Sequence, residues 1–75
     1  MVDQAQVGYA TDEDAHVTIK VFDMLGREVL RPVDRFAYHG QYVATFDARS
    51  LAPGMYSYSI EAGMYRASRL MQVVR

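Results

Sequence analysis

Apolar and polar residues alternate along most of this chain with a period of two. The clearest run is His16-Val17-Thr18-Ile19-Lys20-Val21-Phe22, in which every second residue is β-branched and apolar. Because successive side chains of a strand point to opposite faces, this run predicts a strand that buries Val17, Ile19 and Val21. No stretch of useful length has the 3.6-residue period of a helix. The pattern is therefore that of an all-β domain.

Further alternating runs predict more strands, separated by turn residues. These strands cover residues 6–10, 27–31, 41–47, 55–61 and 64–74. Pro32 ends the strand before it or marks that strand as a sheet edge, because proline cannot donate a ladder hydrogen bond. Residues 33–38 are interpreted as a loop or an irregular strand. Six or seven short strands, each with one apolar face, predict an immunoglobulin-like antiparallel β-sandwich.

Three connections between these strands carry specific turn chemistry. Asp23-Met24-Leu25-Gly26-Arg27 is predicted to be a hairpin connection, with Gly26 placed for a left-handed backbone conformation. Asp47 predicts an Asx turn, in which its carboxylate accepts hydrogen bonds from the backbone just downstream. Pro53-Gly54 is expected to centre a turn before the next strand. Tyr56 in that strand is expected in the core, with its hydroxyl on a buried partner.

The composition confines the chain to one small domain. Its 75 residues suffice for a single domain, and 51% of them are apolar, a fraction ordinary for a folded globule. We assign residues 1–5 to a lead-in segment and residues 6–75 to the domain. Eight basic and nine acidic residues give a net charge of −1, which leaves no electrostatic footprint for nucleic acid or an anionic membrane. The sequence has no cysteine for a disulfide and no apolar run long enough to span a bilayer.

Candidate catalytic and metal-binding residues are few. The two histidines, His16 and His39, do not accompany a serine in a nucleophile-elbow pattern, and the sequence has no glycine-rich phosphate loop. The sequence therefore predicts neither an enzyme nor a bound cofactor. The acidic run Asp12-Glu13-Asp14, with His16, supplies oxygen ligands that a hard cation such as calcium prefers. Its spacing differs from that of the known calcium loop, so a solvated acidic loop is the ordinary interpretation.

Three surface features leave more than one interpretation open. Leu25 at the hairpin tip is either an exposed apolar contact or folds back over the end of the sandwich. Most aromatic residues fall on the inward phase of their strands, and Tyr38 and Tyr65 are the two expected outside, where a carbohydrate could bind. The last strand is basic, with Arg69 and Arg75 among its charges. These charges either protect a sheet edge or belong to a strand that a partner recognises.

Three segments of the chain follow one another in a characteristic order. They are the strand and hairpin over residues 17–29, then Phe46-Asp47-Ala48 with Leu51, and then Pro53-Gly54-Met55-Tyr56-Ser57-Tyr58. Together with the basic and apolar end Arg69-Leu70-Met71-Gln72-Val73-Val74-Arg75, they resemble the C-terminal sorting domain of the type IX secretion system, type A. The chain lacks the Pro-Asn-Pro segment that often opens this family. The immunoglobulin-like domain of the flagellar hook-capping protein shares the Gly-x-Tyr region.

The resemblance implies a removable targeting domain that catalyses no reaction itself. Such a domain follows an N-terminal cargo domain in the same chain and takes it from the periplasm through the outer membrane to the cell surface or the medium. The implied partners are outer-membrane secretion proteins and sortase-like proteins of the type IX system. No nucleic acid partner and no membrane span are implied.

The motif residues that the resemblance singles out span much of the chain. They are Asp23, Leu25, Gly26, Arg27, Glu28, Asp47, Gly54, Tyr56, Arg69, Met71 and Val73. A structural immunoglobulin-like spacer of a multidomain secreted or flagellar protein is the alternative function, and a carbohydrate-binding module is a third. An unpaired edge strand could pair between copies, so the oligomeric state stays open.

Overall fold

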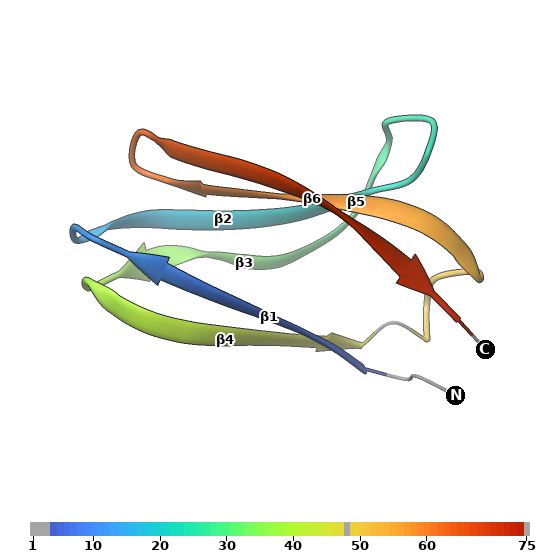
Figure 1. Cartoon of the computed structure of the whole chain (residues 1–75), viewed down its shortest axis with the longest axis horizontal. Coiled ribbons are helices and arrows are strands. Elements are labelled where there is room, and N and C mark those ends of the chain that lie inside the picture. Colours follow the sequence, from blue (N-terminus) through green and yellow to red (C-terminus); the bar gives the residue numbers. More distant parts are fainter. Residues whose placement is uncertain (1–3, 48, 75) are drawn as a thin grey trace.

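Six strands and no helix make up the described part of the chain, residues 4–47 and 49–74 of this computed structural model. The strands are β1 (Gln4–Thr11), β2 (Ala15–Phe22), β3 (Glu28–Ala37), β4 (Gly40–Asp47), β5 (Gly54–Ala62) and β6 (Tyr65–Val73). They form two antiparallel sheets, with the orders β1-β4 and β3-β2-β5-β6 (Figure 1). Immunoglobulin-type sandwiches place strands B and E, and strands C′, C, F and G, in these same two orders. The predicted all-β sandwich is confirmed.

The core lies between the two sheets and is centred on β2. Val17, Ile19 and Val21 have no exposed surface, as their alternation predicts. The short sheet contributes Val7, Tyr9, Ala44 and Phe46 to the same core. Burial of the β-branched side chains on one face of β2 contributes apolar stabilisation to this small domain.

The structure decides between the two interpretations of Pro32, and the edge-strand interpretation is confirmed. The proline does not end a strand, because β3 runs through it to Ala37. Ile19 pairs with Val33 whereas Val21 pairs with Leu30, so two residues of β3 bulge opposite Lys20. Pro32 is one of the two bulged residues, and β3 is an edge strand, where a missing N–H group is tolerated. The segment read as a loop or an irregular strand is therefore the second half of β3, and the strand count is six.

Phe36 lies outside the core, against expectation. Phe36 is 56% exposed, because its register position opposite His16 puts it on the outer face of the four-stranded sheet. Its ring packs edge-on against Tyr38 at a centroid distance of 5.2 Å. Tyr38 and Tyr65 are exposed, as predicted.

Candidate functional site

The carboxylate of Asp23 closes the hairpin between β2 and β3. Its Oδ1 atom accepts hydrogen bonds from the backbone N–H groups of Leu25 and Arg27 at 2.9 and 3.0 Å, and its Oδ2 atom accepts one from Arg27 Nε at 2.8 Å. The backbone bond from Arg27, ahead of the smaller contributions of the Arg27 side chain and Leu25, holds the pKa of Asp23 below its usual value. Gly26 has a φ of 84°, which confirms its predicted left-handed conformation.

The tip of this hairpin presents apolar side chains to the solvent. Leu25 is 79% exposed and Met24 is 60% exposed, so Leu25 does not fold back over the sandwich. Glu28, just after the turn, forms an ion pair with Arg31 of its own strand. The hairpin therefore combines a fixed backbone with an exposed apolar tip, an arrangement that suits a contact surface.

The connection into β5 is fixed by Asp47 and Tyr56. The N–H group of Arg49 donates to Asp47 Oδ1 at 2.8 Å, which confirms the predicted Asx turn. Gly54 begins β5 with a φ of 152°. Tyr56 is buried in the core, and its hydroxyl donates to the carbonyl oxygen of Ala52 at 2.6 Å. This bond ties the connection to the sandwich.

We expect Tyr56→Phe to lower the free energy of unfolding by about 1 kcal/mol, because the part-buried carbonyl of Ala52 loses its donor. Urea denaturation of both proteins measures the change. Tyr38→Phe, at an exposed position, is the matched control and should stay within about 0.5 kcal/mol of the parent. Equal effects of the two substitutions would contradict the role given to the Tyr56 hydroxyl.

The end of β6 packs into the same region. Val73 is buried in the core and pairs with Gly54, while Met71 is half-buried and pairs with Tyr56. Arg69 is exposed and pairs with Tyr58, farther along the strand. Arg75 lies outside the described residues.

The antiparallel connections gather most of the predicted motif residues at one end of the sandwich. The β2–β3 hairpin, the start of β5 and the last residues of β6 all lie at this end (Figure 1). Of the eleven motif residues, Arg69 alone lies away from it, near the middle of β6. Residues that are up to fifty positions apart in the sequence thus lie at one end of the sandwich, some exposed, such as Leu25, and some in its core, such as Tyr56 and Val73.

A family model for secretion system C-terminal sorting domains matches residues 2–73. The chain belongs to this family. Its function is that of a sorting signal for type IX export, which directs a protein to the cell surface or the extracellular space, and domains of this family are non-catalytic. No curated protein and no solved structure matches the chain. The family match covers all six strands, so the whole sandwich is the sorting domain.

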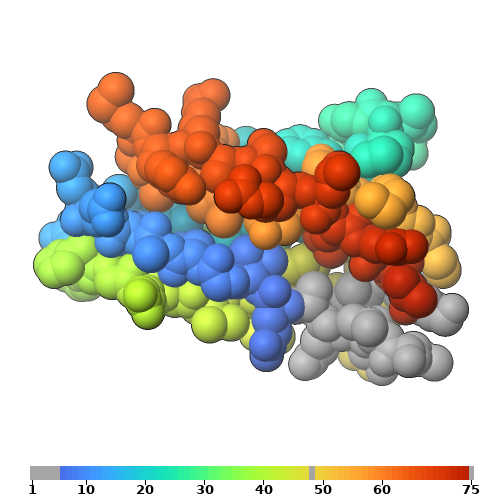
Figure 2. Space-filling view, viewed as in Figure 1, coloured from blue at the N-terminus to red at the C-terminus, as the bar shows by residue number. Residues whose placement is uncertain are grey.

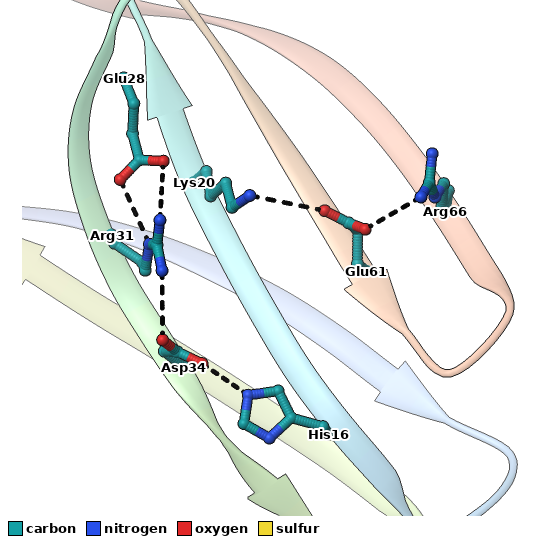
Figure 3. Close-up of polar contacts among 7 residues, drawn as sticks. All are labelled: His16, Lys20, Glu28, Arg31, Asp34, Glu61 and Arg66. Carbon is teal, nitrogen blue, oxygen red and sulfur yellow. Dashed lines mark hydrogen bonds and ion pairs between the residues drawn. The ribbon is translucent and has the colours of Figure 1, made fainter.

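The outer face of the sorting domain's larger sheet carries a network of charged residues (Figure 3). Arg31 bridges Glu28 and Asp34 at 3.1 and 3.3 Å, and His16 Nε2 bonds Asp34 Oδ1. In a second group, Glu61 lies between Lys20 of β2 and Arg66 of β6. Sequence reasoning missed this network. The three-residue spacing of Glu28, Arg31 and Asp34 was the available signal, but the bulge in β3 had to be known to place them on one face.

The stability of the sorting domain is expected to fall in acid. The pKa values of Asp34 and Asp23 lie below their ordinary 3.8, mainly because His16 and the Arg27 backbone, respectively, hydrogen-bond the ionised carboxylates. A lowered folded-state pKa stabilises the fold above pH 4, and this stabilisation is lost as the pH falls through the folded-state values. We expect a drop in Tm of several degrees between pH 5 and pH 2.5, measured by circular dichroism. The Asp34→Asn variant should drop less over the same range, and an equal drop would contradict the assignment.

The acidic loop does not gather a metal site. Asp14 accepts hydrogen bonds from the backbone N–H and ring of His39 at 2.8 and 3.0 Å, whereas His16 faces Asp34 on the outer sheet face. Across residues 4–47 and 49–74, no group of three or more histidine, aspartate or glutamate side chains could hold a metal ion. In the same ranges there is no helix of the length and apolarity required to cross a membrane.

Proposed function

We propose that the type IX machinery recognises this sorting domain as a folded unit, through the end of the sandwich that carries the hairpin tip. The observation that carries the proposal is the exposure of Leu25, 79%, on a hairpin that Asp23 fixes. Asp23, Gly26, Asp47, Gly54 and Tyr56 shape this end. Leu25 and its neighbour Met24 supply apolar surface for a partner.

The proposed partners are the outer-membrane secretion proteins and the sortase-like proteins of the type IX system. The N-terminal cargo domain of the same chain crosses the periplasm, and the sorting domain then takes it through the outer membrane. The domain itself carries out no reaction.

A passenger assay tests the proposal. A fluorescent protein carries residues 1–75 at its C-terminus in a host with the type IX machinery, and fluorescence is followed in the periplasm, on the surface and in the medium. Leu25→Ser is expected to reduce export about tenfold, because a central apolar anchor of a protein interface is worth 1.4 kcal/mol or more. Val43→Ser is the matched control, since Val43 is 66% exposed and lies on β4 of the other sheet.

The outcomes separate the candidate functions. Export of the parent fusion with loss in Leu25→Ser supports recognition through the hairpin end. Export that is unchanged in Leu25→Ser contradicts the proposed surface. Retention of the parent fusion in the periplasm contradicts the sorting role of this chain and favours the structural spacer.

A further inference from the structure

The two sheets of the sandwich differ in width, and the difference leaves a groove. Two strands, spaced about 4.8 Å apart, cannot cover the inner face of a sheet of four. The inner face of β2 is completely covered, but that of β6 is open over its first five residues: Tyr65 is 57% exposed, Arg69 is exposed and Ala67 is half-buried. The result is a groove of about 680 Å³ between β1 and β6, which lie side by side on one face (Figure 2). Its floor includes Tyr58 and Ile60.

The free edge of β1 forms one wall of this groove and has no protection against strand addition. β1 contains no charged residue and no proline, and it pairs with β4 over eight residues without a bulge. The edge strands of the larger sheet differ. β3 carries Pro32, a bulge and several charges, and β6 carries Arg66 and Arg69. Uncharged, regular edges accept strands from other chains, whereas charges, prolines and bulges prevent this.

Opposite charges mark the two ends of the groove. Asp12 and Glu13 line one end of the groove, near the turn between β5 and β6. This turn lies close to the β1–β2 loop, since a Cβ atom added at Gly63 would be 3.6 Å from the Cβ atom of Ala15. Arg69 lines the groove four residues along β6 from Tyr65, a separation of about 13 Å in a strand. Within the described ranges, no ion pair joins Asp12, Glu13 or Arg69 to another residue.

We propose that the edge of β1 binds an extended segment of an export partner by strand addition, with the side chains of that segment in the groove. Antiparallel pairing with β1 starts the segment at the acidic end and runs it toward Arg69. The segment therefore carries a basic residue facing Asp12 and Glu13, a small apolar residue two positions later, and an acidic residue four positions later facing Arg69. Alternate residues of a strand share one face, so all three fit one groove. This inference rests on the proposed sorting function.

Two peptides of identical composition test the segment chemistry on the 75-residue chain. The first is Val-Thr-Lys-Thr-Val-Thr-Asp-Thr-Val, and the second exchanges its lysine and aspartate. Titration into the 15N-labelled domain should shift and protect the amides of β1 with the first peptide, and the second should bind about tenfold more weakly because like charges then meet at both ends. Equal binding, or no binding of either peptide, would overturn the proposal. Light scattering of the domain alone tests whether a second copy occupies the groove instead. If the domain is a dimer and Ala67→Trp makes it monomeric, the groove is a dimer interface and the proposal is overturned.

The passenger assay tests the groove in the exporting cell. A Gly-Ser linker joins the passenger to the domain, so that no residues preceding the domain can pair with the free edge of β1. Ala67→Trp fills the groove and Arg69→Glu reverses its charge, and each should lower export about tenfold. Ser68→Trp and Arg66→Glu are the matched controls, because these neighbours point to the outer face of the same strand. Variants are compared only where the Tm stays within a few degrees of the parent. Normal export of the groove variants overturns the strand-addition proposal while the sorting function stands. If the parent fusion itself is not exported, both the sorting function and the strand-addition proposal are contradicted.

Discussion

Removal of the last five residues, Met71 to Arg75, is expected to abolish export of a fused passenger. The deletion takes away the register partners of Gly54, Met55 and Tyr56 at the end of β5. It also removes Val73, which is 5% exposed in the core, and uncovers the ring of Tyr56. The start of β5, at the end of the sandwich that carries the proposed recognition surface, then has no neighbouring strand on its β6 side.

Conservative substitutions at the same positions separate shape from chemistry. The double variant Met71→Leu and Val73→Ile keeps the strand and nearly the same apolar volume, so it should be exported at close to the parent level. The fraction of fluorescence in the medium and on the surface, relative to the periplasm, measures both variants. Export of the truncated fusion at the parent level would refute a requirement for the end of β6.

Ile19→Ala is expected to lower the free energy of unfolding by about 3 kcal/mol. Ile19 has no exposed surface and lies at the centre of the core, so the smaller side chain loses apolar burial and leaves a cavity. A small domain has a total stability of roughly 5–10 kcal/mol, so this loss is a large share of it. Thr18→Ala, on the opposite face of β2 and half-exposed, is the matched control and should cost less than about 1 kcal/mol.

Urea denaturation gives the free energies of unfolding of both variants; because the chain has no tryptophan, unfolding is followed by far-UV circular dichroism. Export of the same two variants relates these free energies to function. If the machinery recognises the folded domain, the exported fraction of the Ile19→Ala fusion should fall in proportion to the fraction of the variant that is unfolded at the growth temperature. Unchanged export of a mostly unfolded variant would show that a linear segment, and not the sandwich, is the signal.

Local chemistry explains why the sequence predicts so much of the strand pattern. The period-two alternation over residues 16–22 already identifies Val17, Ile19 and Val21 as core, because the pleat allows one burial pattern only. Gly26 and Asp47 likewise reveal their turns, since a left-handed residue and an Asx turn depend on neighbours within four positions. The order of the three motif segments along the chain also identifies the sorting-domain family, which the family match confirms.

Only the tertiary structure decides what depends on partners far away in the sequence. Pro32 sits in the middle of a strand because β3 is an edge with a bulge, whereas the proline alone leaves open whether its strand ends or continues along an edge. Phe36 is exposed because its register partner is His16. The gathering of the motif residues at one end follows from the antiparallel order of the strands. The groove beside β1 exists because two strands face four, a difference of sheet width that no local sequence pattern encodes.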